Sequence, residues 1–337
     1  MQVLGIETSC DETAAAVVRD GNRILSSVVS TQYDLHERFG GVVPEIACRA
    51  HIENVLPVIA EALRGADLPL PALDGIAATS TPGLIGALLI GVTAAKSLSW
   101  ALDLPLLAVN HLHAHILAAW LGGRQPELPA VSLVVSGGHT SLFLTEGPLA
   151  HRRLGGTVDD AAGEAFDKVA NILRLGYPGG PAIERAAREG DPAAVDFPRS
   201  WLEPGSADFS FSGLKTAVLY HCLGQNASKK DISAVEYSPQ FVADVAASFQ
   251  EAVVDVLVRK AFDAAERHHV ASLIVGGGVA ANGRLRERLV AEAQERGLTL
   301  YLARPEFCTD NAAMVAAVGC RLLKEGRRAP LSVEAEP

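Results

Sequence analysis

The sequence has few cysteines and lacks an excess of positive charge. Its five cysteines, Cys10, Cys48, Cys222, Cys308 and Cys320, are scattered and show no C-x-x-C spacing. They indicate neither a disulfide framework nor a zinc ribbon, and they favour a reducing compartment. With 29 basic and 39 acidic residues, the formal net charge is −10. Because a freestanding nucleic-acid-binding protein usually carries a basic excess, an RNA substrate would need a partner to help hold it.

Long apolar runs are also missing. The N-terminal residues MQVLGIETSC enter a strand pattern directly, without the basic and apolar regions of a signal peptide. The longest apolar stretch, Leu84 to Val92, is soon followed by Lys96. It is far shorter than the roughly 20 residues that a membrane-spanning helix needs. We therefore expect a soluble cytoplasmic protein with no membrane partner.

Apolar residues are nevertheless plentiful. They make up 49% of the 337 residues, whereas aromatic residues make up only 5%, so the core must be built from Ala, Val, Leu and Ile. A chain longer than about 250 to 300 residues exceeds the size at which one core stops growing. The composition therefore favours an α/β enzyme with two lobes.

Strand patterns alternate with helix patterns in the first 129 residues. Residues 2–7 and the two sides of the turn at 19–22 predict a three-stranded meander. Helical spacing is predicted over 44–64, 84–102 and 111–121, and strands over 75–79 and 106–109. This alternation indicates βαβ units.

The second part of the chain repeats the opening pattern. Residues 130–146 read as strand, glycine-containing turn and strand, and residues 272–275 predict another strand, followed by a helix from about Ala280. Residues 155–268 are expected to be mostly helical. We therefore predict an N-terminal lobe at 1–129, a C-terminal lobe at 130–325 and a loose tail at 326–337.

The segment His111-Leu112-His113-Ala114-His115 carries the sharpest chemical signal. On a helix, His111 and His115 share one face and can bind one metal ion, whereas His113 projects roughly opposite. Asp310 is the best candidate for a third ligand, although an Asp at the start of a helix is often only an N-cap. Two histidines and one carboxylate would leave coordination positions open to a substrate.

Two glycine-rich turns are candidates for binding a nucleotide. In Ser136-Gly137-Gly138-His139-Thr140, successive N–H groups can form an anion-binding concavity, although a plain hairpin turn is equally compatible. The run from Gly276 to Asn282 can let a flat base lie on the backbone, with Asn282 bonding its edge. A generic helix entry remains the alternative for this second turn.

Two further segments carry carboxylates. The run from Glu7 to Thr13 is acidic and rich in hydroxyls, and it could position a metal, a base or a phosphate, or only cap a turn. Asp167, Gly180 and Glu184 combine glycine with carboxylates of the kind that hold ribose hydroxyls. Taken alone, this second signal is weak.

Together these motifs closely resemble the TsaD family, the tRNA N6-adenosine threonylcarbamoyltransferases, in their bacterial form. The resemblance covers about residues 1 to 325 in collinear order. It is carried by GIETSCDET, the Thr81-Pro82-Gly83-Leu84 turn, NHLHAH, LVVSGGHT, AGEAFDKVA, GYPGGP, FSFSGLKTA, GGGVAAN and TDNAAM. It implies the two-lobed actin, Hsp70 and sugar-kinase (ASKHA) architecture with duplicated lobes.

The resemblance also implies an activity and a set of site residues. The threonylcarbamoyl group would pass from threonylcarbamoyl-AMP to N6 of adenosine 37 in tRNAs that read ANN codons, forming t6A and releasing AMP. His111, His115 and Asp310 correspond to the family's metal ligands, usually for one iron or zinc ion. The substrate and nucleotide contacts correspond to Val134, Val135, Ser136, Gly137, Gly138, Asp167, Gly180, Glu184 and Asn282. Glu184 stands where the family often has Asp, so its reach to the ribose is an open point.

The implied reaction assigns roles to two turns. Attack by the exocyclic amine of adenosine needs proton removal, for which Asp11 or Glu12 is predicted, because the first turn of this fold is expected to face its cleft. The turn from Ser136 to Thr140 would hold the AMP phosphate. The resemblance implies TsaB and TsaE as protein partners.

Two other functions remain as alternatives. A metalloprotease is suggested by His111-x-x-x-His115, but zinc proteases with this spacing usually carry a Glu beside the first His, where Leu112 stands here. An ATP-dependent ASKHA kinase or nucleotide-operated binding module is suggested by fold analogy. The first turn, Glu7-Thr8-Ser9-Cys10, lacks the glycine that such kinases use near the γ-phosphate.

Overall fold

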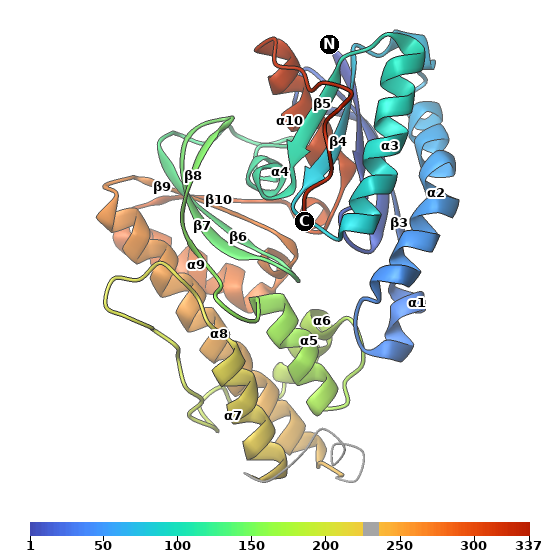
Figure 1. Cartoon of the computed structure of the whole chain (residues 1–337). Helices are drawn as coiled ribbons and strands as arrows, with labels where there is room; N and C mark the ends of the chain where they lie inside the picture. The colour runs from blue at the N-terminus through green and yellow to red at the C-terminus, as the bar shows by residue number, and fades with distance from the viewer. Residues whose placement is uncertain (225–235) are drawn as a thin grey trace. The chain divides into compact units, whose positions relative to one another are not determined.

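The computed structural model describes residues 1–224 and 236–337 and divides them into two compact units. Unit 1 comprises Met1–Pro126, Gly147–His151 and Ala303–Pro337, and unit 2 comprises Glu127–Glu146 and Arg152–Leu302. Each unit is built around one mixed five-stranded sheet (Figure 1).

The sheet of unit 1 has the order β3-β2-β1-β4-β5. Its strands are β1 (Gln2–Glu7), β2 (Glu12–Arg19), β3 (Arg23–Thr31), β4 (Gly75–Thr81) and β5 (Leu106–Asn110). The first three form the predicted antiparallel meander, and β1, β4 and β5 run parallel. Parallel strands need crossover connections, which the predicted helices supply.

Helices cover both faces of this sheet. The helices of unit 1 are α1 (Tyr33–His36), α2 (Pro44–Gly65), α3 (Ile85–Leu102), α4 (His111–Ala118) and α10 (Ala312–Lys324). Leu4 and Ile6 of β1 belong to the core formed with α2 and α3. On the other face α10 packs so closely that a Cβ on Gly5 would lie 2.3 Å from the Ala312 carbonyl oxygen. Glycine at this position lets α10 reach the centre of the sheet.

Unit 2 repeats the topology of unit 1, with the sheet order β10-β9-β6-β7-β8. Its strands are β6 (Ala130–Val135), β7 (Thr140–Gly147), β8 (Ala150–Gly156), β9 (Ser272–Gly276) and β10 (Thr299–Leu302). β6 pairs antiparallel with β7 and parallel with β9, as β1 pairs with β2 and β4. The strands β8 and β10 escaped prediction because they are edge strands, the first half polar and the second only four residues long.

Helices supply most of the remaining residues of unit 2. They are α5 (Ala162–Ile172), α6 (Gly179–Ala187), α7 (Ser212–Leu223), α8 (Pro239–Arg267) and α9 (Gly283–Arg296). The helix expected from about Ala280 begins at Gly283, and a 3-10 turn at Gly278–Ala281 precedes it. Part of the segment expected to be mostly helical, residues 225–235, lies outside the described residues.

The C-terminal residues depart from the predicted lobe boundaries. Residues 303–337 group with unit 1, because α10 covers the sheet of that unit. The expectation of a loose tail is wrong. The Ala329 N–H donates to the Leu106 carbonyl at 2.8 Å, the Glu336 N–H donates to the Ser80 carbonyl at 2.9 Å, and Val333 packs against the core.

One helix among the described residues, α3, is long and apolar enough to cross a membrane by length and composition alone. It has a mean hydropathy of 1.5, and one third of it (33%) is buried within this chain. Here α3 packs against β4 and α2. The apolar stretch predicted from the sequence was shorter than α3, because Lys96 interrupts the run of apolar residues.

Candidate metal centre and glycine-rich turns

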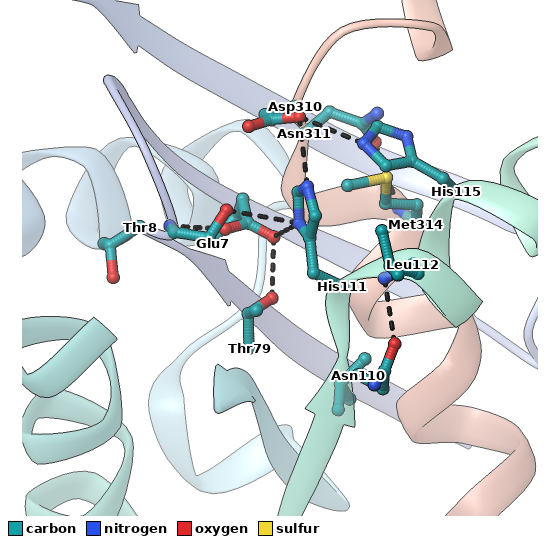
Figure 2. A network of polar contacts seen from close by, with 12 residues as sticks. Glu7, Thr8, Thr79, Asn110, His111, Leu112, His115, Asp310, Asn311 and Met314 are labelled. Atoms are coloured by element: carbon teal, nitrogen blue, oxygen red, sulfur yellow. Dashed lines mark hydrogen bonds and ion pairs between the residues drawn. The ribbon is translucent and has the colours of Figure 1, made fainter. Parts of the chain in front are cut away.

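The predicted ligands His111, His115 and Asp310 converge in unit 1, with their ligand atoms within 4.8 Å of one another. The Nε2 atoms of His115 and His111 lie 3.1 Å and 3.5 Å from the same oxygen of Asp310, its Oδ1 (Figure 2). Both imidazoles are buried. The histidines belong to α4, which begins directly after β5 and is capped by the Asn110 side chain.

Asp310 does not cap the C-terminal helix. The N-cap of α10 is Asn311, whose side-chain oxygen accepts the Met314 N–H at 3.0 Å. The carboxylate of Asp310 therefore lies outside the helix and reaches both imidazoles. This arrangement removes the simplest structural explanation for an Asp at this position.

His113 lies away from the metal cluster, as the helical spacing predicts. Its ring centroid is 4.5 Å from that of His151. Burial lowers the pKa of both side chains, and the neighbouring His113 lowers the pKa of His151 further, to about 4. The His113–His151 pair is therefore neutral at physiological pH.

The donor set of the cluster fits one divalent ion. Two imidazole nitrogens and one carboxylate oxygen suit zinc or non-haem Fe(II), and three protein ligands leave coordination positions open. Burial alone would lower the pKa of His111, but the negative charges of Asp310 and Glu7 raise it to about 9. Burial and the nearby His111 lower the pKa of His115. A site that attracts a proton to His111 is also electrostatically suited to a metal cation.

Glu7 lies beside the cluster, although the sequence reasoning did not single it out from its motif. It lies at the end of β1 with no exposed surface, and its Oε2 is 3.2 Å from His111 Nδ1. Oε2 also accepts the Thr79 hydroxyl at 2.6 Å, and Oε1 accepts the Ser9 N–H at 2.6 Å. The only sequence signal was the acidic run in which Glu7 stands.

Asp11 and Glu12 are buried at the turn between β1 and β2. The Tyr33 hydroxyl donates to Glu12 Oε1 at 3.0 Å. Burial raises the pKa of Glu12 well above its usual range, and the negative charges of Asp310 and Asp11 add to the rise.

The turn after β6 is open, unlike the turn after β1. Gly137 and Gly138 are exposed, and nothing lies within 4 Å of a Cβ built on either. Their N–H groups donate no hydrogen bond within the described chain, whereas the Ser136 and Gly137 carbonyls accept from the start of α5. Neither glycine has a positive φ, so other residues could adopt the backbone conformation of this turn. Val134 and Val135 are buried in β6, so only their backbone could contact a ligand.

The other predicted nucleotide contacts are adjacent to one another in unit 2. Asp167 Oδ1 accepts the Gly179 N–H at 2.7 Å, beside Gly180, and Glu184 Oε1 accepts the Gly283 N–H at 3.1 Å, beside Asn282. Asn282 caps α9 by accepting the Leu285 N–H and donates from Nδ2 to Gln250. One Nδ2 hydrogen remains for a ligand. These side chains therefore also form hydrogen bonds within the protein, which sequence spacing alone did not indicate.

Two units with the same sheet topology, one carrying a His-His-Asp cluster and the other glycine-rich turns, define an ASKHA-class protein. Solved structures share this fold. Component A of (R)-2-hydroxyglutaryl-CoA dehydratase from Acidaminococcus fermentans aligns over 95% of this chain and 98% of its own, with a TM-score of 0.53 and 15% identity. HypF from T. kodakarensis aligns over 96% of this chain and 48% of its own, with a TM-score of 0.59 and 16% identity.

Sequence comparison identifies the family within this class. The profile of TsaD, described as tRNA N6-adenosine threonylcarbamoyltransferase, matches residues 23–317. Proteins named tRNA N6-adenosine threonylcarbamoyltransferase from Anaeromyxobacter dehalogenans (strain 2CP-C) and Bacillus cereus (strain ATCC 14579) are 53% and 52% identical to this chain. The alignments cover 100% and 99% of this chain and 98% and 95% of those proteins. The chain belongs to the TsaD family.

Proposed function

We propose that this enzyme transfers the threonylcarbamoyl group from threonylcarbamoyl-AMP to N6 of adenosine 37 in tRNAs that read ANN codons, releasing AMP. Membership of the TsaD family supports the activity. The observation that carries the mechanism is the convergence of His111, His115 and Asp310 from segments nearly 200 residues apart, since His115 and Asp310 are separated by 195 positions.

The residues of unit 1 are proposed to hold one iron or zinc ion. His111 and His115 would bind it through Nε2, and Asp310 would bind it through its carboxylate. Held by these three residues, such an ion would supply Lewis-acid stabilisation of the negative charge that develops on the threonylcarbamoyl oxygen. The buried imidazoles exclude water from one side of the site, which strengthens these electrostatic interactions.

The residues of unit 2 are proposed to bind the AMP part of the donor. The exposed N–H groups of Gly137 and Gly138 are free to donate to phosphate oxygens, which suits an anion-binding turn. Asp167 and Glu184 are proposed to hold the ribose hydroxyls through carboxylate oxygens. The remaining Nδ2 hydrogen of Asn282 is proposed to donate to the adenine.

Asp11 and Glu12 are proposed as the groups that accept the proton from the attacking amine. Both are buried in the first turn, and Asp310 is close enough for its charge to raise the pKa of Glu12. A raised pKa makes a carboxylate a stronger base once it is ionised. The two neighbouring carboxyl groups are therefore proposed to act together in accepting the proton.

TsaB and TsaE are proposed as partners in the cytoplasm, because an acidic chain is poorly suited to hold tRNA alone. Large apolar side chains are exposed on the adjoining helices α2 and α3, at Ile52, Leu56, Ile85 and Leu89, with exposed fractions of 64%, 66%, 46% and 50%. Exposed large apolar side chains on neighbouring helices are typical of an interaction surface. We assign this surface to the TsaB-type partner.

Ile52→Glu together with Leu89→Glu should abolish co-purification with TsaB while leaving metal content unchanged.

The two alternative functions are not favoured by the family match. Leu112 occupies the position where a zinc protease needs its glutamate, and its N–H is bonded to Asn110 at 2.9 Å. The first turn of unit 1 is filled by buried side chains, so its backbone is not open to a γ-phosphate.

Nucleoside mass analysis tests the proposal directly. Depletion of this protein in its host should remove t6A from total tRNA, and the wild-type chain should restore it. The His115→Ala chain should fail to restore it, whereas the His113→Ala chain should succeed. Normal t6A levels after depletion would refute the assignment.

A further inference from the structure

We propose that Glu7 is a positioning residue that holds His111 in the tautomer with Nδ1 protonated and Nε2 directed at the metal. The inference rests on the proposed metal-dependent function and names a group outside the His-His-Asp ligand set. It acts through His111 and does not itself touch the ion.

Sheet topology places Glu7 beside His111. The strands β1, β4 and β5 are parallel neighbours, so their carboxyl ends meet at one edge. Glu7 ends β1, Thr79 lies one residue beyond the paired Ala78 of β4, and His111 follows β5 directly. Thr79 and His111, which lie 72 and 104 positions after Glu7 in the sequence, therefore both meet its carboxylate (Figure 2).

Hydrogen bonding at Glu7 fixes which protons surround it. Its Oε1 accepts the backbone N–H of Ser9, and its Oε2 accepts the Thr79 hydroxyl. A carboxylate held in this way only accepts, and its Oε2 lies 3.2 Å from His111 Nδ1. A lone pair on Nδ1 would face this negatively charged oxygen, whereas an N–H would donate to it. The carboxylate thus selects the Nδ1–H form.

When a metal ion is bound, the Nδ1–H form presents the Nε2 lone pair on the side of Asp310 and His115. Nε2 of His111 lies 3.5 Å from Asp310 Oδ1, the oxygen that His115 Nε2 also approaches. Ser9 Oγ, at 3.2 Å from Nδ1, could donate a proton there and favour the opposite tautomer. Glu7 decides between the two because its charge favours the N–H over a lone pair.

The two histidines differ in this support. His115 Nδ1 is buried and has no hydrogen-bond partner within the described chain. Only His111 of the two histidines is therefore oriented by a carboxylate. Loss of a carboxylate that orients a metal-bound histidine typically lowers metal affinity about 10- to 100-fold. Loss of Glu7 should therefore weaken the centre without removing any ligand.

Glu7→Gln is the sharpest test because it is nearly isosteric. The glutamine can place its oxygen toward Ser9, whose backbone N–H cannot reverse, while the Thr79 hydroxyl can rotate to accept. Its NH2 group would then face His111 Nδ1, favour a lone pair there, and leave a proton on Nε2 where the metal must bind. Zinc and Fe(II) affinity should fall about 10- to 100-fold.

The measurement is a competition titration of purified full-length protein with zinc against a chelator of known affinity. Glu53→Gln, at an exposed glutamate of α2, removes the same charge away from the site and should leave affinity unchanged. Zinc-loaded protein with 15N-labelled histidine should show a His111 Nδ1–H that is hydrogen-bonded to a carboxylate in the wild type, and Glu7→Gln should shift this N–H signal because an amide replaces the carboxylate. Thermal melting of the metal-free variants checks folding.

The outcomes separate this inference from the proposed function. If Glu7→Gln binds zinc as tightly as Glu53→Gln does, Glu7 does not position His111, even if transfer activity depends on the metal. If Glu7→Gln does not fold, Thr79→Val replaces it and should weaken zinc binding severalfold, and unchanged affinity there overturns the inference. Weaker binding in these variants of a protein that lacks transfer activity would uphold the inference and refute the function.

Discussion

The turn after β1 in unit 1 and the turn after β6 in unit 2 occupy the same place in two sheets of the same topology, yet they present opposite surfaces. The first turn buries Glu7, Ser9 and Asp11. The second exposes Gly137 and Gly138 and leaves their N–H groups without protein acceptors among the described residues. Equivalent backbone positions are therefore proposed to serve a cation in one unit and an anion in the other.

Packing explains the difference between the two turns. The first turn is enclosed by its neighbours: the Leu84 N–H donates to the Ser9 carbonyl, the Thr8 hydroxyl donates to the Ala87 carbonyl, and His111 contacts Glu7. In the second turn, the contacts run from the Ser136 and Gly137 carbonyls to α5, and the N–H side stays open. Duplicated topology fixes where a site forms, and side-chain type with local packing fixes its charge preference.

The largest effect is expected from removing a ligand in unit 1. His111→Ala and His115→Ala should each lower metal affinity and transfer activity by at least about 100-fold, since loss of a supporting group alone costs about 10- to 100-fold. His113→Ala is the matched control on the same helix and should retain metal. Metal content of the three purified variants decides the prediction, and equal loss in all three would contradict the assignment of His111 and His115 as a ligand pair.

The contrast between the two turns is tested most directly by placing a carboxylate in the second turn, as in the first. Gly137→Asp should fold, because nothing lies within 4 Å of the new Cβ and φ is not positive. Its carboxylate should repel phosphate, so AMP binding should weaken about 10-fold or more while adenosine binding changes little. Calorimetric titration of both ligands measures this selectivity. Gly137→Ala is the neutral control, and unchanged AMP binding by the Asp variant would leave the turn a structural hairpin.

Substitution of Gly277, another glycine of unit 2, should lower stability, whereas substitution of Gly137 should not. Gly277 has φ +98°, and a Cβ there would lie 2.3 Å from the Val135 carbonyl oxygen. Gly277→Ala should therefore lower the free energy of unfolding by about 1 to 3 kcal/mol, as strained backbone and overpacking typically do. Urea unfolding beside Gly137→Ala tests the contrast. Equal stability of both variants would contradict the close contact between Gly277 and the Val135 carbonyl.

Asn282→Ala should combine a structural and a binding loss. Removal of the N-cap of α9 should cost about 1 kcal/mol of stability. If its Nδ2 also contacts adenine, adenosine and AMP should both bind more weakly, in contrast to Gly137→Asp. Asn282→Asp keeps the capping oxygen but removes the amide donor, so it should restore stability without restoring binding. Binding that recovers together with stability would limit Asn282 to the cap.

The effect that is smallest at neutral pH concerns the neutral His113–His151 pair of unit 1. The folded pKa of His151, about 4, is below the unfolded value of about 6.5, so below pH 6.5 the unfolded chain binds the proton first. This pair therefore costs stability as the pH falls from 6.5 toward 4, with a slope of up to about 1.4 kcal/mol per pH unit. His151→Gln should flatten the pH dependence of urea unfolding in this window, whereas His269→Gln, at an exposed position, should not.

Local patterns in the sequence predicted much of the fold and part of the site. The meander, the βαβ alternation and the second copy at 130–146 were readable because strand and helix periods act over a few residues. The pair His111 and His115 was readable for the same reason, since four residues make about one helical turn. The glycines at 137 and 138 predicted a turn by composition alone, and left open whether it binds an anion or is a plain hairpin.

Longer-range features came only from the tertiary structure. The docking of residues 303–337 on unit 1, the capping of α10 by Asn311 instead of Asp310, and the structural bonds of Asn282 depend on which elements pack together. Glu7 meets His111 across 104 positions because β1, β4 and β5 end at one edge. Sequence alone fixed the local elements and the histidine pair, because both depend on short-range spacing. The order of strands in the sheet decided which carboxylates meet those histidines, because contacts between distant segments depend on packing.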